Sequence, residues 1–386
     1  MVTSNTEDLV ALCGSLTERI AVKRTPGAEK AFVDAMLQQM REDGIVWSMG
    51  AAECGGRAAS LSDLARMTSA IARQSGSAGL IFAMHASQAL CIVRHCEDSL
   101  FLKDLQARMI GGQHLIASGT SEKGPSGDIF KSLCTVDDAP TGASLVTKDS
   151  PNISYLDLAG AILITAMRQG RSGRPSQVLI AAETANMDIA SGAPAEFMGM
   201  GGMSNAPYVV TARFAPEAVF ARPFAAIARE TMTPVIHILW ASAWSGIAAD
   251  ILGKVRQFVE KQADHDAAAA NSMRLELSRL VDLQFTMIAL IRDAIAGWEN
   301  PDVSAAPNLS FRQTARIKRL KIVCSETLTK LCVDALEILG ISGYSERGPF
   351  SISQPIRDAL SAKVMISNFR LGTANANIER FIEEAI

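Results

Sequence analysis

The chain has 386 residues, of which 48% are hydrophobic, and its 37 basic and 40 acidic side chains leave a formal net charge of −3. This composition is typical of a folded protein with room for two or three domains, and it excludes a disordered chain. The near balance of charge excludes a broad basic surface that could hold nucleic acid or an anionic membrane. We therefore expect the partners to be small molecules or other subunits.

The sequence shows no targeting or metal-binding pattern. The first residues, MVTSNTEDLV, lack a basic leader, and no apolar run approaches the roughly 20 residues of a membrane helix. We expect a cytoplasmic protein without a membrane segment. Seven cysteines without a Cys-x-x-Cys pair and five scattered histidines predict reduced thiols and no metal site.

Residues 1–114 are predicted to form a helical domain. Three apolar residues share one face of a predicted helix: Phe32, Met36 and Met40. Ser60 and Asp63 have the spacing of a capping box, which indicates that a second helix begins after Ser60.

Residues 115–225 are predicted to form a small antiparallel β domain. Short runs of β-favouring residues begin near Ile153, Ala161, Gln177 and Pro207. Clusters of Gly, Pro, Ser and Asn separate these runs, as turns separate the strands of a sheet.

Residues 226–386 are predicted to form a four-helix bundle, because apolar residues recur there at helical spacing. One run holds Trp240, Trp244, Ile247, Ile251, Val255 and Phe258, a second holds Leu275, Leu280, Leu283, Met287 and Ile291, and a third holds Leu320, Val323, Leu328, Leu331 and Ile338. The predicted fold is therefore α+β and mostly α, with a helical domain, a β domain and a bundle in that order.

Five motifs follow one another along the chain. They are AECGG from Ala52, SEKGPSGD from Ser121 to Asp128, NISY from Asn152, FMGMGGMSNAPYVVTARFAPEAVF from Phe197 to Phe220, and LEILGISGYSE from Leu336 to Glu346. In order and spacing they resemble motifs of the acyl-CoA dehydrogenase superfamily. The first two motifs have the sequences PEEYGG and TEPGAGSD in that superfamily. That superfamily has the same predicted order of domains.

The resemblance implies an FAD cofactor. Seven residues match flavin-binding positions of the family: Thr120, Ser121, Gly127, Ile153, Ser154, Gly340 and Gly343. Hydroxyl donors stabilise the negative charge that a flavin gains at its pyrimidine edge, and this is the role expected for Ser121 and Ser154. Each residue also has a structural interpretation, because serines cap turns and glycines form them.

The catalytic glutamate of the family has no counterpart. The carboxyl-terminal stretch resembles the family's signature through Arg357–Asp358 and a helical segment expected to close on Gly372–Thr373. Counting from the first pair puts the glutamate position on Ile366, and counting from the second puts it on Leu371. A few relatives carry the glutamate on the first bundle helix, at the position of Ile236. None of these residues can accept a proton.

Other side chains could take over parts of the chemistry. His237 could accept a proton because imidazole titrates near neutral pH, although a lone histidine is more often structural. Asn368 and Arg370 could hold a carboxylate or thioester oxygen, or could be solvated on a helix surface. Three residues are expected to shape the substrate pocket: Met84, Trp240 and Trp244.

Three functions remain open. The favoured one is an oxidoreductase of acyl thioesters, linked to CoA or a carrier protein, whose base is displaced or whose carbanion arises by decarboxylation. The second is a monooxygenase of the same fold that uses reduced flavin and oxygen, and the third is a flavin-binding or oligomerising relative without catalysis. An electron acceptor or flavin reductase and a homo-oligomer, a dimer or tetramer, are the protein partners that the resemblance implies.

Overall fold

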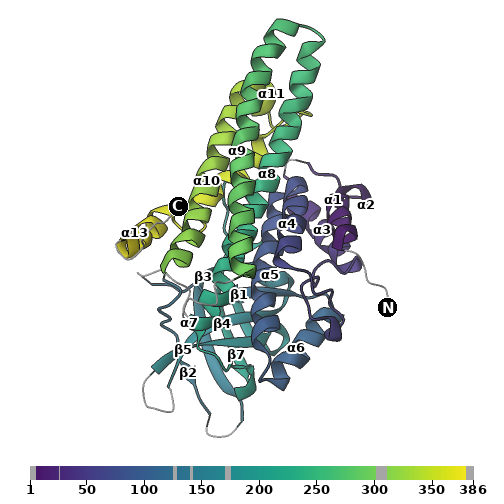
Figure 1. Ribbon diagram of the computed structural model, residues 1–386. Helices are drawn as coiled ribbons and strands as arrows, with labels where there is room; N and C mark the ends of the chain where they lie inside the picture. The colour runs from purple at the N-terminus through teal and green to yellow at the C-terminus, as the bar shows by residue number, and fades with distance from the viewer. Residues whose placement is uncertain are drawn as a thin grey trace.

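The computed structural model describes residues 6–25, 27–124, 128–139, 142–169, 175–300 and 311–379, and its amino-terminal part is helical as predicted (Figure 1). The helices are α1 (Thr6–Gly14), α2 (Leu16–Arg19), α3 (Glu29–Glu42), α4 (Leu61–Gln74), α5 (Gly76–His95) and α6 (Leu100–Gly111), with a short 3-10 helix η1 (Ala52–Cys54). The predicted capping box begins α4. Ser60 Oγ accepts the Asp63 amide at 3.1 Å, and the Asp63 carboxylate accepts the Ser60 amide at 3.2 Å.

Two small sheets follow. One has the order β1 (Leu115–Gly119), β4 (Ala159–Gln169) and β5 (Pro175–Glu183), and the other has the order β2 (Val136–Asp137), β3 (Ser144–Ser154), β7 (Asn205–Phe214) and β6 (Met187–Ser191). Most neighbouring strands are antiparallel, as predicted, but β1 runs parallel to β4. The predicted antiparallel domain thus contains one parallel pair, because β2 and β3 separate its two strands along the chain and a long crossover permits parallel pairing.

Three long helices form most of the carboxyl-terminal part. After α7 (Phe224–Ile227) come α8 (Thr233–Ala263), α9 (Ala267–Glu299) and α10 (Phe311–Leu339), which form a rod that rises above the rest of the molecule (Figure 1). The chain continues as α11 (Ile341–Tyr344), α12 (Ser353–Leu360), the 3-10 helix η6 (Ser361–Lys363) and α13 (Asn368–Glu379). Both α12 and α13 contact α10 and complete the bundle, while α4 of the amino-terminal part packs along α8.

The predicted apolar stripes lie mostly inside the protein. All six residues of the first run, on α8, are buried. Leu275 on α9 and Val323 on α10 were predicted to be core residues but are exposed. The predicted close of a helix at Gly372–Thr373 was also wrong, because both residues lie inside α13.

Two apolar helical stretches lie in the core. Gly76–His95 and Phe224–Ala263 are long and apolar enough to cross a membrane, but 89% and 83% of their most apolar windows are buried inside the protein. Within α5, the ring of His85 donates from Nε2 to the Val46 carbonyl and accepts the Ile116 amide at Nδ1, both at 2.9 Å. Burial lowers the pKa of His85 to about 4. The neutral ring therefore ties α5 to β1.

A π-helical turn, η5 (Ala228–Met232), leads directly into α8. The wider π turn leaves carbonyl oxygens without partners inside the helix, and neighbouring side chains bind them. Ser87 Oγ donates to the Met232 carbonyl at 3.1 Å, and Trp298 Nε1 donates to the Glu230 carbonyl at 3.0 Å. The turn is therefore held by α5 on one side and by α9 on the other.

Candidate functional site

The end of β3 and the start of β7 carry a network of polar side chains. Ser154 pairs with Asn205 in the register of the two strands. Its hydroxyl donates to Asn205 Oδ1 at 2.7 Å, and Asn152 Nδ2 approaches the same oxygen at 3.3 Å. Asn205 Nδ2 in turn donates to the Met203 carbonyl at 3.1 Å. The strand register thus places three polar side chains at one point.

Ser121 joins this network from the loop after β1. Its hydroxyl donates to the Asn152 carbonyl at 2.9 Å and lies 2.8 Å from the hydroxyl of Ser150. The two serines singled out from the sequence therefore lie in one hydrogen-bonded group. Asn152 Oδ1 is buried and has no partner among the described residues. A buried acceptor without a donor is costly, so a ligand donor at this position would be stabilising.

The other predicted flavin-binding residues are less closely connected. Thr120 Oγ1 lies 3.1 Å from Ser118 Oγ, and Ile153 is buried. Gly127 lies outside the described residues. Gly340 precedes α11 at its N-cap with φ of +55° and open space beside its Cα, whereas a Cβ on Gly343 would lie 2.6 Å from Leu339 Cβ.

The two turn glycines therefore differ in what they require. The backbone conformation of Gly340 itself favours glycine. Gly343 is explained by local packing, without any ligand. Among the described residues, no hydrogen bond joins either glycine to the serine network.

Two residues with left-handed backbone flank the network. Tyr155 has φ of +43° and Met200 has φ of +60°. Tyr155 donates its amide to the Ser204 carbonyl at 2.7 Å and its hydroxyl to the Ile116 carbonyl at 3.1 Å. Such conformations are costly for residues other than glycine, and they are found more often at functional sites. They support a functional role for this part of the β domain.

The Arg-Asp motif holds the Met200 turn in place. Arg357 binds Glu346 at 2.7 Å. Asp358 accepts the Met200 amide at 2.6 Å and Gln354 Nε2 at 2.8 Å. Burial raises the pKa of Asp358 to about 6. The motif therefore joins α12 to the loop that precedes β7.

A second cluster lies in the bundle, where three rings of α8 follow one another. His237 stacks on Trp240 with ring centroids 6.0 Å apart, and Trp240 stacks on Trp244 at 6.5 Å. His237 Nδ1 donates to the Ile317 carbonyl at 3.2 Å. Burial, reinforced by Lys321 and Lys318, lowers the pKa of His237 to about 4. The ring is therefore neutral at pH 7 and does not titrate near neutrality, as free imidazole does.

Lys321 of α10 completes this cluster, and the sequence analysis missed it. Its side chain is fully buried, and its ammonium group binds the Ile366 carbonyl and Asn368 Oδ1, the latter at 2.7 Å. Burial lowers the pKa of Lys321 to about 8. The available signal was spacing, because Lys321 lies on the helical face of the buried residues Cys324 and Leu328.

The remaining predicted site residues are spread over other elements. Asn368 binds both Lys321 and Ser325, whose hydroxyl accepts Asn368 Nδ2 at 2.9 Å. Arg370 is exposed on α13, and Met84 is half-buried on α5. The structure thus brings His237, Trp240, Trp244 and Asn368 together around Lys321.

No acid occupies the positions expected for a catalytic glutamate. Ile366, Leu371 and Ile236 are all partly buried apolar residues. At the first of them, the backbone carbonyl binds the buried cation Lys321. This region therefore has the charge opposite to the one that proton abstraction by a carboxylate requires.

The polar network of the β domain suits a flavin ring. It combines serine hydroxyls that could turn toward a ligand with the unpartnered oxygen of Asn152, which could accept a ring N–H. Because Asn152 carries an amide, its contact with such a ring would be polar. The residues present thus fit the ring through hydrogen bonds.

No protein-family model and no curated protein sequence matches the chain. Solved structures do match it. A butyryl-CoA dehydrogenase from Megasphaera elsdenii aligns with a TM-score of 0.78 and 16% identity, over 98% of this chain and 99% of that chain. A nitrososynthase from Micromonospora carbonacea var. africana aligns with a TM-score of 0.79 and 17% identity, over 98% and 97%.

A third similar structure is that of FMN-bound TdsC from a Paenibacillus species. It has a TM-score of 0.75 and 15% identity, over 97% of this chain and 95% of that chain. The predicted acyl-CoA dehydrogenase-like fold is therefore confirmed. At these identities, the likeness concerns the fold.

Proposed function

We propose that this chain, which has the acyl-CoA dehydrogenase fold, is a flavin-dependent oxidoreductase that acts on an acyl thioester. The observation that carries the proposal is the network of Ser121, Asn152, Ser154 and Asn205, with its one unpartnered buried oxygen. The carrier of the thioester would be CoA or a carrier protein. The cofactor would be FAD, and a redox partner would be an electron acceptor or a flavin reductase.

In this proposal, the chain's own residues bind and orient. Ser121 and Ser154 would donate to the pyrimidine edge of the ring, and Asn152 would accept from it. When bound, a flavin supplies a two-electron oxidant. The buried strand ends of β3 and β7 would exclude water from one side of the ring and hold these donors in a fixed geometry.

Proton transfer in this enzyme would not use the family's glutamate. Of the candidate catalytic residues, His237 could accept a proton but is a weak base, because burial lowers its pKa to about 4. Asn368 and Arg370 would hold a carboxylate or thioester oxygen. A substrate that forms its carbanion by decarboxylation would need no base of this kind. The pocket for the acyl chain would be lined by Met84, Trp240 and Trp244.

The test is a visible absorption spectrum of the purified protein before and after anaerobic addition of acyl thioesters. The expected result is a flavin spectrum that bleaches with thioester, because the bound flavin takes up electrons from it. Ser154→Ala should weaken flavin retention, whereas Thr147→Ala, at an exposed site on the same strand, should not. Chromatography of the released cofactor would separate FAD from FMN.

A monooxygenase is the second candidate, and two observations favour it. The positions of the family's glutamate are apolar, and a nitrososynthase is as similar in fold as a butyryl-CoA dehydrogenase. Thioesters that leave the spectrum unchanged, combined with oxygen consumption in the presence of a flavin reductase, would support this reaction. A colourless protein that binds no added FAD would instead support a relative without catalysis.

A further inference from the structure

Lys321 is a buried cation whose hydrogen-bond partners among the described residues are neutral, although the carboxylate of Glu326 raises its pKa from a distance. Its ammonium group donates to two neutral acceptors, the Ile366 carbonyl and the Asn368 amide oxygen. Across the described part of the chain, no Asp or Glu forms a salt bridge with it, in contrast to the buried Lys148, which binds Glu122 at 2.9 Å. A buried cation without a salt-bridge partner is costly, and proteins commonly retain such a charge where it binds an anionic ligand.

The side chains around Lys321 supply further donors, and the two acceptors considered next are already bound. The indole N–H groups of Trp240 and Trp244 are buried and have no partner among the described residues. The Lys321 ammonium lies 5.9 Å from the centre of the Trp244 ring. The Asn368 oxygen is already bound by Lys321, and the Ile317 carbonyl is bound by His237. The group that complements one cation and two spare N–H donors is an anion with several lone pairs.

We infer that Lys321, Trp240, Trp244 and Asn368, here called the lysine–tryptophan cluster, bind a carboxylate of the substrate. The substrate would then be an acyl thioester whose chain carries a second acid group at its far end. This inference rests on the proposed function and names the substrate class of the same site. A purely structural role would not explain why a lysine occupies this position, because an uncharged donor could bind Ile366 and Asn368 without the cost of a buried charge.

The test compares two CoA thioesters of equal length, hexanoyl-CoA and adipoyl-CoA, which differ in a terminal methyl or carboxylate. Titration calorimetry measures the affinity of each for the purified protein with whatever flavin it carries. The expected preference for adipoyl-CoA is about tenfold or more, which corresponds to a charge-assisted hydrogen bond. Equal affinities, or a preference for hexanoyl-CoA, would overturn the inference.

Substitutions test whether Lys321 causes the preference for adipoyl-CoA. Lys321→Met keeps the length of the side chain and removes its charge, so it should abolish the preference. Lys321→Arg should retain part of it. The control is Lys330→Met, which removes an exposed lysine of the same helix that binds Asp334. A preference that persists in a folded Lys321→Met protein would show that the cluster does not bind the carboxylate.

Free adipate separates this inference from the proposed function. If the protein carries no flavin and binds neither thioester, the proposed function fails, but adipate can still be followed by the fluorescence of Trp240 and Trp244. A fluorescence change in the parent protein that is lost in Lys321→Met would support the carboxylate site. The absence of any change that depends on Lys321 would overturn it.

Discussion

Asp358 is held where its protonated form is favoured. The side chain is 2% exposed, and burial raises its pKa to about 6 although the Met200 amide and Gln354 bind it. A carboxyl group whose pKa is higher in the folded than in the unfolded state stabilises the fold most at low pH. That contribution is present below pH about 4 and is lost as the pH rises to about 6.

Asp358→Asn should remove this pH dependence. The amide oxygen can still accept the Met200 N–H, while no charge forms in the core at neutral pH. Relative to the parent, the variant should gain stability between pH 4 and pH 7, by up to about 3 kcal/mol. Thermal unfolding across that range measures the difference, with Asp334→Asn, the half-buried partner of the exposed Lys330, as the control. A constant difference at all pH values would contradict the assignment.

The side chains of the candidate site were only partly predictable. Ser121 and Ser154 were found from the sequence because the motif around each resembles a known one. Lys321 and Asn205 were missed because their roles depend on partners at long range, such as Asn368 and Ser154. Spacing on a helix or strand shows that a polar residue faces the core, but it does not show which group it meets there.

At the scale of elements, a buried ion pair fixes the loop that carries Ser121. Glu122 accepts the Leu133 amide at 2.6 Å and the Cys134 amide at 2.9 Å, and it binds Lys148 of β3. Burial alone would raise the pKa of Glu122, but these hydrogen bonds lower it to about 2. The carboxylate thus joins three segments beneath the serine network.

Glu122→Gln should destabilise the protein by about 3 kcal/mol, because it leaves the fully buried Lys148 without a counter-charge. Urea unfolding monitored by circular dichroism measures the effect. The exposed pair Asp138–Arg168 provides the control, since Asp138→Asn should cost less than about 1 kcal/mol. Adding Lys148→Met to Glu122→Gln should recover part of the loss. If Glu122→Gln and Asp138→Asn lowered the free energy of unfolding equally, the loss of the buried ion pair would not be the cause of the destabilisation.

The elements themselves were predicted unevenly. Helices such as α4 and α8 follow from apolar spacing and capping, which are local in sequence. The parallel pairing of β1 with β4 was not foreseen, because strand partners are chosen by contacts distant along the chain. The interior glycine of α13 misled the prediction of its end, since Gly372 has open space around it and is tolerated within the helix.

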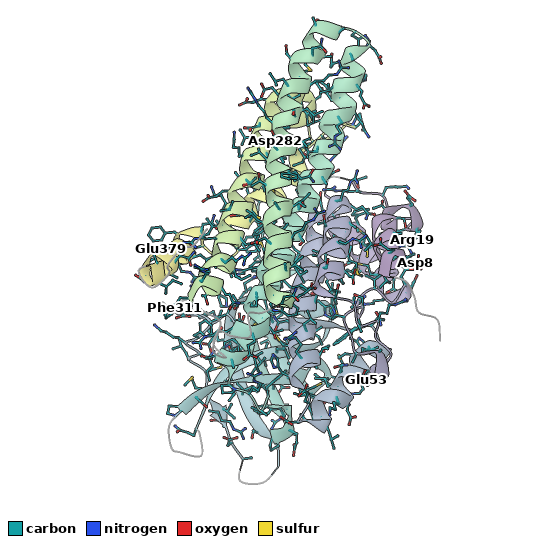
Figure 2. The ribbon with its side chains drawn as sticks, in the orientation of Figure 1. Asp8, Arg19, Glu53, Asp282, Phe311 and Glu379 are labelled. Atoms are coloured by element: carbon teal, nitrogen blue, oxygen red, sulfur yellow. The ribbon has the colours of Figure 1, made fainter. Side chains whose placement is uncertain are left out.

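At the scale of the whole molecule, several segments of the carboxyl-terminal part present apolar side chains to solvent. They lie on α10, α11, α13 and the segment before α13: Val323, Val333, Ile341, Tyr344, Val364 and Phe369. The helix α13 projects from the bundle (Figure 1), with Glu379 near its end (Figure 2). Exposed apolar side chains become favourable when association with another subunit covers them. They support the expected homo-oligomer.

Phe369→Asp should shift the protein toward smaller species, because Phe369 is 84% exposed and a charge there would be buried on association. Sedimentation equilibrium at micromolar concentration measures the shift. Leu100→Asp, at a residue 80% exposed on α6 of the amino-terminal part, is the matched control. A parent protein that sediments as a monomer would remove the basis for this interface.

The π turn before α8 determines which way the rest of that helix faces. A π turn accommodates one more residue than an α turn, and each residue rotates a helix by about 100°. Losing a single residue between Ala228 and Met232 would therefore swing the aromatic ladder of His237, Trp240 and Trp244 away from Lys321 without altering any of these side chains. The direction in which the side chains of α8 point is thus set by one widened turn that precedes the bundle.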